Sequence, residues 1–142
     1  MQPSTKVFLS YAHADSKPAR ELAEYLQREG FRVWDPDFEL LPGSEWTSTL
    51  RSALDSADAL VVLLSPAAME SRSVVHEIEY ALGAKHLRGR LIPVLLRPTR
   101  QVPWILNELQ MIHHQSTATT GKEIADSLTR PPYVPKIKVR TG

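Results

Sequence analysis

The stretch Leu60-Val61-Val62-Leu63-Leu64 decides the fold class of this chain, because every residue in it is apolar and nothing polar interrupts the run. Such a run is typical of a strand that is buried on both faces, as in a parallel sheet covered by helices. With Ala59 before it, the apolar run covers residues 59–64, and three further apolar runs lie at residues 7–11, 31–34 and 91–96. The last of them contains Pro93, which has no N–H to donate to the ladder, so we expect that strand to be less central or irregular.

The segments between these runs have apolar residues at helical spacing. Strands that alternate with helices predict a doubly wound α/β domain with a parallel sheet and right-handed crossovers. Gly30 stands where a C′ residue would end the first helix, and Ser44 is a plausible N-cap of the second. We expect a last helix over residues 122–128 and a fifth strand near residues 111–115. The apolar positions of the first three helices are Ala19, Leu22, Ala23 and Leu26; Trp46, Leu50, Ala53, Leu54 and Ala57; and Val74, Val75, Ile78, Ala81 and Leu82.

Length and composition are those of one globular domain. The 142 residues suffice for one ordinary domain but not for two, and 42% apolar with 23% charged residues argues against disorder. Seventeen Lys and Arg against sixteen Asp and Glu give a net charge of +1, which offers no broad footprint for nucleic acid or an anionic membrane. We place the domain at residues 1–130 and interpret the proline-rich residues 131–142 as a tail or linker, with an additional strand as the alternative.

The sequence also indicates the cellular compartment in which the protein is expected. It has no apolar run of about 18 residues, which a membrane-spanning helix would need, and its first residues lack the apolar region of a signal peptide. Cysteine is absent, which excludes disulfides, cysteine metal sites and cysteine nucleophiles. We therefore expect a cytoplasmic protein without a membrane partner.

The loops at the carboxyl ends of the strands are where a ligand is expected, because open α/β sheets bind ligands there, at the topological switch point. The second of these loops, after Trp34, is long enough to suggest a function. No phosphate-binding GxxxxGK[ST] loop and no GxGxxG dinucleotide fingerprint is present. Ser65 rather than an aspartate follows the third strand, and no acidic pair follows the first, so a phospho-accepting receiver domain is not expected.

Glu77 is the most informative residue of the third helix. With Val74 at zero and about 100° per residue, the apolar arc centres near 40°, and Glu77 falls near 300°, at its border. His76 and Glu79 fall on the side that faces water. A half-desolvated carboxylate at a border position has a raised pKa, which suits acid–base work or the stabilisation of a cation. Periodicity alone favours the simpler interpretation, a boundary glutamate that reaches water.

Other candidates have simpler explanations. His113 and His114 are adjacent, so their side chains diverge, and no metal site is expected there. Asp35 and Asp37 share a loop, but no third ligand accompanies them. Trp46 begins an apolar stripe and is most simply a core residue. Trp104 follows a proline, and either packing or contact with a partner would explain it.

Three segments, in this order, resemble a known family. KVFLSYAHAD, residues 6–15, is similar to the first box of Toll/interleukin-1 receptor (TIR) domains, a strand that ends in Ser-Tyr. GFRVWDPDFELLPGSEW, residues 30–46, resembles the family's second strand, its long BB loop and the start of the next helix. SRSVVHEIEYA, residues 71–81, resembles the third-helix motif with the glutamate of NAD+-cleaving members, in particular of the bacterial branch.

This resemblance implies a flavodoxin-like, doubly wound, five-stranded parallel sheet of order 2-1-3-4-5 with helices on both faces. It implies an NAD+ nucleosidase that hydrolyses or cyclises NAD+ as its substrate, without a cofactor or metal, and reverses the interpretation of Glu77 in favour of a catalytic residue. Tyr11, Ala12, Trp46 and Ser73 would then line the substrate pocket. Ser73 is a departure, since many bacterial members have Trp at that position.

The resemblance further implies self-association through the BB loop, here about residues 35–45, with other TIR domains as partners in immune or stress signalling such as bacterial defence. Phe38, Leu40, Leu41 and Gly43 are the contact residues expected in that loop. Two rival hypotheses remain. One is a non-catalytic adaptor that binds other TIR domains through the same loop. The other is a deoxyribosyltransferase-like enzyme, which the Ser-Tyr ending of the first strand fits poorly.

Overall fold

A computed structural model describes residues 5–36 and 46–132 of the chain. Strands and helices alternate through most of it, as the sequence predicts. The strands are β1 (Lys6–Ser10), β2 (Arg32–Trp34), β3 (Ala59–Leu64), β4 (Leu91–Leu95) and β5 (Ile112–His113). The helices are α1 (Ser16–Arg28), α3 (Trp46–Ser56), α4 (Pro66–Glu70), α5 (Arg72–Gly83), α6 (Trp104–Asn107) and α7 (Thr117–Thr129), with short 3-10 turns η1 (His13–Asp15) and η2 (Lys85–Leu87).

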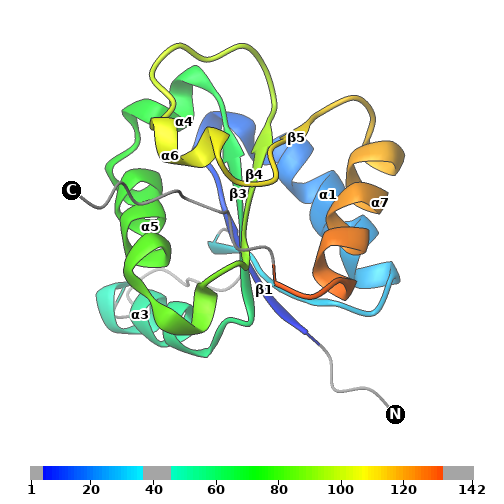
Figure 1. The fold of residues 1–142 in the computed structure, drawn as a ribbon, viewed down its shortest axis with the longest axis horizontal. Coiled ribbons are helices and arrows are strands. Elements are labelled where there is room, and N and C mark those ends of the chain that lie inside the picture. Colours follow the sequence, from blue (N-terminus) through cyan, green and yellow to red (C-terminus); the bar gives the residue numbers. More distant parts are fainter. Residues whose placement is uncertain (1–4, 37–45, 133–142) are drawn as a thin grey trace, which may run out of the picture.

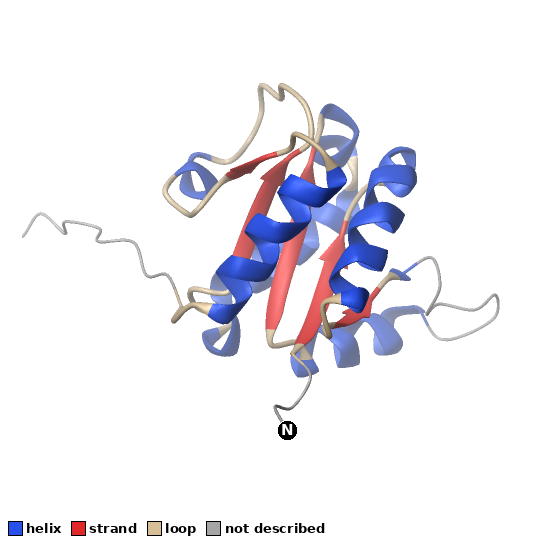
Figure 2. Cartoon of the chain, turned by 90° about the vertical axis from the view of Figure 1, so that its right-hand side faces the viewer, coloured by secondary structure: helices blue, strands red, loops and turns tan. Residues whose placement is uncertain are grey.

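The strands form one parallel sheet in the order β2-β1-β3-β4-β5. Helices α1 and α7 cover one face, and α3 and α5 lie on the opposite side (Figure 1). Figure 2 shows the face that α1 and α7 cover. The predicted sheet, its order and the helices on both faces are thus confirmed. Because the chain goes from β1 to β2 on one side and then crosses to β3 on the other, the switch point lies between β1 and β3.

Two apolar cores, one on each face of the sheet, hold the layers together. Alternate residues of the strands contribute to each core, since successive side chains point to opposite faces. On one face, Val7 and Leu9 of β1 pack with apolar residues of α1 and α7; on the other, Phe8 packs with those of α3 and α5. All six residues of β3 are buried, as expected from its uninterrupted apolar run.

Strand β4 lies between β3 and β5, so it is less central than β3, as Pro93 led us to expect, but it is not at the edge of the sheet. The hydrogen bonds explain why the proline is tolerated. The backbone N–H of Leu96 donates to β3, and the carbonyl of Arg90 accepts a hydrogen bond from β3. The backbone N–H and C=O groups of the even-numbered residues of β4 therefore point to β3, and the ring nitrogen of Pro93 points to β5. The ladder with β5 begins only at Val94, so no partner is lost at the position that lacks an N–H.

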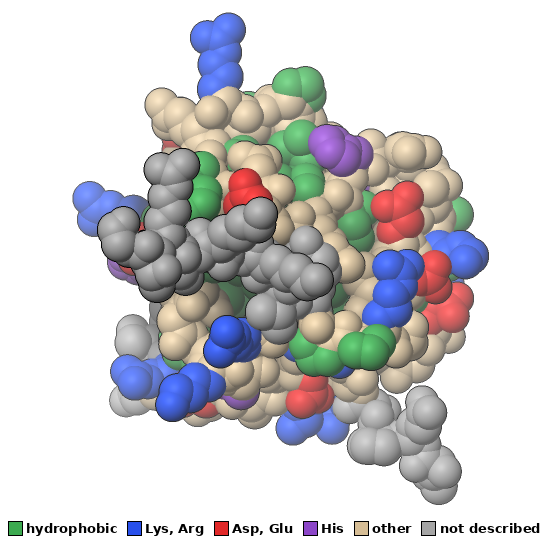
Figure 3. Space-filling view, viewed as in Figure 1, with side chains coloured by type: hydrophobic (Ala, Val, Ile, Leu, Met, Phe, Trp, Pro, Cys, Tyr) green, Lys and Arg blue, Asp and Glu red, His purple; other side chains and the backbone are tan. Residues whose placement is uncertain are grey.

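The surface agrees with the balanced composition. Figure 3 shows both cationic and anionic side chains scattered over one face. Leu82, which periodicity assigned to the buried stripe of α5, is 45% exposed, so that expectation was wrong. In the described residues, no helix combines the length and apolarity that crossing a bilayer requires.

Candidate active site

Ser10 and Glu77 form a buried polar pair at the carboxyl end of β1. Ser10 is the last residue of the strand, and its side chain points to the same face as Phe8, the face that α5 covers. Its hydroxyl donates a hydrogen bond of 2.6 Å to Oε1 of Glu77. Ser10 is fully buried, and Glu77 exposes only 4% of its surface. A carboxylate therefore lies inside the protein beside the switch point.

The burial of Glu77 goes beyond its predicted place at the border of the apolar arc. The buried residues of α5 are Val74, Glu77, Ile78 and Ala81, spaced at i, i+3, i+4 and i+7. At about 100° per residue their arc centres near 350°, about 50° from the centre expected from apolar residues alone. His76 and Glu79 are exposed, as predicted. The helix is thus rotated so that it buries a carboxylate, while Leu82 is left in contact with solvent.

Burial raises the pKa of Glu77 from 4.5 to about 7, because desolvation penalises the charged form. The hydrogen bond from Ser10 acts in the opposite direction and lowers the pKa, since a donated hydrogen bond stabilises the carboxylate. The side chain can therefore change its charge near neutral pH. Such a group can stabilise a developing positive charge or exchange a proton, and perturbed carboxylates of this kind concentrate at functional sites.

A second polar contact links the loops after β1 and β2. Tyr11, directly after β1, donates a hydrogen bond from its hydroxyl to Asp35, which is buried directly after β2. Ala12, also buried, packs into the core beneath α5. These two predicted pocket residues thus lie at the carboxyl end of β1, next to Ser10.

Within the described part of the chain, no group of three potential ligands could hold a metal ion. His113 is exposed, and Nδ1 of His114 is hydrogen-bonded to the hydroxyl of Thr120 at 2.9 Å. Trp104 is 71% exposed. Packing inside the domain therefore explains little of why a tryptophan stands at this position.

The remaining predicted site residues are less informative about the pocket. Ser73 lies on α5 about one turn before Glu77 and is exposed. Trp46 is the first residue of α3. The predicted BB-loop contacts lie outside the described residues: Phe38, Leu40, Leu41 and Gly43.

A cluster around Asp15 was missed by the sequence reasoning. Asp15 is buried, bonded by the hydroxyl of Ser65 and paired with Arg97 at 3.1 Å. Asp15 directly precedes α1, so its only signal in the sequence was that of an ordinary helix N-cap. The residues that join it are 50 and 82 positions away in the chain, and only the fold brings them together.

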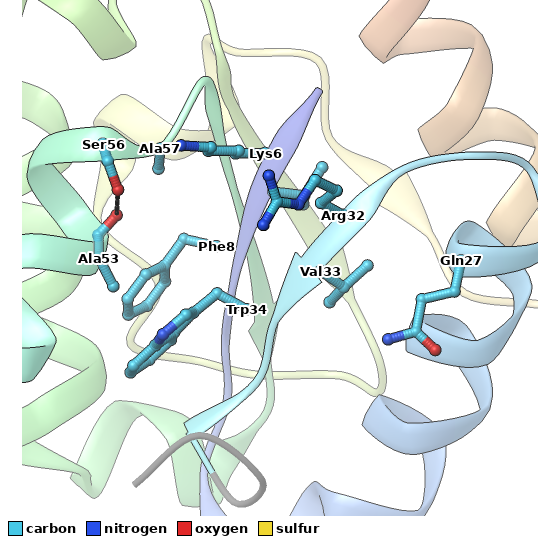
Figure 4. A pocket seen from close by; sticks show the side chains of 10 residues that line it. Lys6, Phe8, Gln27, Arg32, Val33, Trp34, Ala53, Ser56 and Ala57 are labelled. Carbon is cyan, nitrogen blue, oxygen red and sulfur yellow. Dashed lines mark hydrogen bonds between the residues drawn. The ribbon is translucent and has the colours of Figure 1, made fainter. Parts of the chain in front are cut away.

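A cavity of about 380 Å³ lies away from Glu77, along the edge strand β2. Lys6, Phe8, Arg32 and Trp34 point toward α3 (Figure 4), and the rings of Phe8 and Trp34 stack with centroids 4.9 Å apart. Because Lys6 begins β1, this cavity extends toward the amino end of the sheet. In parallel sheets of this kind, ligands bind at the opposite end, so we do not place the active site in this cavity.

Comparison with protein-family models identifies the family of this chain. Its model, described as TIR domain, matches residues 7–128. The TIR domain of the Toll-related receptor TRR-2 from Hydra magnipapillata has the same fold, with a TM-score of 0.74 at 19% identity, covering 87% of this chain and 98% of that chain.

Three curated relatives match parts of this chain. The stimulator of interferon genes protein of Magallana gigas is 26% identical over 129 residues, 87% of this chain and 31% of the relative. The 2′ cyclic ADP-D-ribose synthase BtTIR of Bacteroides thetaiotaomicron is 28% identical over 96 residues, 66% of this chain and 33% of the relative. The NAD(+) hydrolase TcpA of Theionarchaea archaeon (strain DG-70-1) is 33% identical over 98 residues, 67% of this chain and 30% of the relative. This chain thus spans about a third of their length.

Proposed function

The chain belongs to the TIR domain family, and we propose that it is an NAD+ nucleosidase that cleaves the bond between nicotinamide and ribose, with Glu77 as the catalytic residue. The observation that carries this proposal is the buried Ser10–Glu77 pair at the carboxyl end of β1, beside the switch point. Two relatives named for NAD+ hydrolysis and cyclic ADP-ribose synthesis support the reaction class.

Cleavage needs little assistance at the leaving group. The C1′–N1 bond breaks, and its electron pair passes to the pyridinium nitrogen, so nicotinamide leaves as a neutral molecule without a general acid. The ribose acquires oxocarbenium character, as in glycoside hydrolysis. Water then adds its oxygen to C1′ and releases a proton, which gives ADP-ribose. In a cyclising enzyme, a hydroxyl of the same substrate replaces the water.

The role of Glu77 in this scheme is electrostatic. Its carboxylate stabilises the positive charge that develops on the ribose, and the surrounding apolar residues strengthen that interaction by excluding water. The charged form is required, so cleavage should increase as the pH rises through about 7, the pKa of Glu77. Ser10 holds the carboxylate in place and favours its charged form.

The proposal includes activation by self-assembly. With only 4% of its surface exposed, Glu77 can reach a ribose only if its side chain or the residues that cover it move. Contact between TIR domains through the BB loop would supply the energy for that opening. The role in immune or stress signalling is proposed by analogy with the relative named stimulator of interferon genes protein.

Incubation with NAD+ tests the proposal. Concentrated or bead-tethered protein is mixed with NAD+, and nicotinamide and nucleotide products are separated by chromatography. Glu77→Gln keeps the size of the side chain but removes its charge, and should slow cleavage about 10²- to 10³-fold. Glu79→Gln, on the exposed side of α5, is the matched control and should keep the parental rate. If Glu77→Gln cleaves NAD+ as fast as the parent, the assigned role is wrong.

A parent protein that leaves NAD+ intact even when crowded and assembled would favour the adaptor function. The burial of Glu77 is the observation consistent with that alternative, because it blocks direct access to the carboxylate in this conformation. Binding to other TIR domains without NAD+ loss would then be the activity to measure.

A further inference from the structure

Asp15 is a buried carboxylate that connects three loops at the carboxyl edge of the sheet. It follows β1 through η1, and it exposes only 1% of its surface. Ser65, the residue after β3, donates its hydroxyl hydrogen to Oδ2 of Asp15 and accepts a hydrogen bond from the backbone N–H of Ala68. Arg97, two residues after β4, donates to Oδ1 of Asp15 at 3.1 Å. The loops after β1, β3 and β4 are therefore joined through one side chain.

Arg97 is fixed at one end by Asp15, while much of its guanidinium is open to solvent. Its side chain is 56% exposed, whereas the Asp15 side chain that holds it is 2% exposed. Among the described residues, Asp15 is the partner of its guanidinium, through one terminal nitrogen. The other N–H groups of a guanidinium form a planar fork that suits two oxygens of a phosphate. Asp15 makes no cap bond to α1 although it stands at the N-cap position, so its carboxylate serves the loops instead.

The cluster lies close to the proposed catalytic pair. Ser10 is beside Val62 in the register of β1 and β3. Ser65 is three residues farther along the chain than Val62, roughly 10 Å at about 3.3 Å per residue. Arg97 therefore lies along the same edge of the sheet as Glu77, displaced from β1 across β3 toward β4.

A cavity is lined by the residues that follow Ser65 and Arg97 along the chain. It measures about 360 Å³ and lies between α4 and the loop that follows Arg97. Met69 and two prolines, Pro66 and Pro98, supply apolar walls. The polar groups of the lining come from Glu70, Thr99, Arg100 and Gln101. Apolar walls with a few polar groups are typical of pockets that bind small molecules and cofactors, and a nucleoside is of that class.

We propose that Arg97, held by Asp15, binds the diphosphate of NAD+, and that the cavity between α4 and the loop after Arg97 receives the adenosine. This inference rests on the proposed function. The three parts follow the order of a dinucleotide: the ribose that is cleaved at Glu77, the diphosphate at Arg97, and the adenosine beyond. Dinucleotides lie across this same edge in other doubly wound sheets.

Binding of ADP-ribose by calorimetry tests the site without requiring turnover, because ADP-ribose contains the diphosphate and the adenosine but no nicotinamide. Arg97→Ala should weaken its binding roughly 10- to 100-fold, the usual effect of losing a hydrogen bond between charged groups. Arg97→Lys keeps the charge but not the fork, and should bind with intermediate affinity. Arg88→Ala, an exposed arginine at the end of η2, is the control and should bind as the parent does.

Kinetics with shortened substrates separate substrate binding from a structural role. Arg97→Ala should raise KM for NAD+ with kcat nearly unchanged, and should cleave nicotinamide riboside, which has no phosphate, as the parent does. Gln101→Trp, which fills the cavity, should raise KM for NAD+ but not for nicotinamide mononucleotide, which has no adenosine.

Three results would overturn the inference. The parent does not bind ADP-ribose, or Arg97→Ala binds it as tightly as the parent, or Arg97→Ala loses cleavage of NAD+ and nicotinamide riboside equally, as a purely structural clasp would. A protein whose binding of ADP-ribose depends on Arg97 but which leaves NAD+ intact would instead refute the proposed function and keep the binding site.

Discussion

Replacing Glu77 with Gln should stabilise this protein at alkaline pH, because the substitution removes a charge that folding takes out of water. Glu77 exposes 4% of its surface and its pKa is raised from 4.5 to about 7. The amide has nearly the same shape, and its oxygen can still accept the hydrogen bond from Ser10. A side chain retained for catalysis would thus reduce stability, as is common at active sites.

The magnitude follows from the difference in pKa between the folded and unfolded chain. A pKa raised by folding means that the native state holds its proton more tightly, so this stabilisation is fully present below pH 4.5 and is lost as the pH rises to about 7. A difference of about 2.5 pKa units at about 1.36 kcal/mol each corresponds to about 3 kcal/mol. The Glu77→Gln variant does not lose this stability, because its amide does not ionise. Its stability relative to the parent should therefore increase by about 3 kcal/mol between pH 4 and pH 8.

Urea unfolding of parent and variant at half-unit intervals from pH 4 to pH 8 measures this difference. Other titrating groups contribute equally to both proteins and cancel. In thermal unfolding, the same difference corresponds to a shift of roughly 10 °C at pH 8. Glu79→Gln, at an exposed position of the same helix, should show no comparable pH-dependent gain. A stability difference between Glu77→Gln and the parent that stays constant over this range would refute the reasoning, because Glu77 would then not be desolvated by folding.

Three further predictions concern other parts of the domain. Ser10→Ala removes the donor that stabilises the charged carboxylate, so the pH profile of NAD+ cleavage should shift to higher pH; an unchanged profile would mean that this hydrogen bond does not influence the catalytic group. The double substitution Leu40→Asp and Leu41→Asp should abolish activity and leave the thermal midpoint nearly unchanged, whereas activity that persists in strict proportion to protein concentration would argue against self-association through the BB loop. Gly121→Ala should destabilise the domain by about 1–2 kcal/mol in urea unfolding, because the added methyl group would lie 2.4 Å from the ring of Tyr25. The cost of this overlap exceeds the gain from the higher helix propensity of alanine. In a Tyr25→Ala background the same substitution should become neutral or stabilising.

The local pattern of apolar residues is sufficient to predict the sheet and the main helices that flank it. The apolar run of Ala59–Leu64 matches β3 from end to end, and Gly30 has the positive φ of 97° expected after a helix. Apolar periodicity is a local property, which is why it succeeds there. It located the last helix less well: α7 begins at Thr117, five residues before the expected start. The threonine-rich first turn has no apolar stripe, and only the cap at Ser116, which accepts a hydrogen bond from Thr119 N–H, marks the beginning.

Which polar side chains are buried, and what they contact, cannot be predicted from local patterns, because it depends on how the elements pack. On a helical wheel Glu77 is a border residue. In the structure it is buried beside Ser10, which is 67 residues away in the sequence and whose hydrogen bond offsets part of the cost of desolvation. Asp15 likewise has the local pattern of a helix cap but bonds instead to Ser65 and Arg97, from two other loops. Periodicity reports what a residue prefers on average, whereas burial of a charge depends on partners that come together only when the strands are paired.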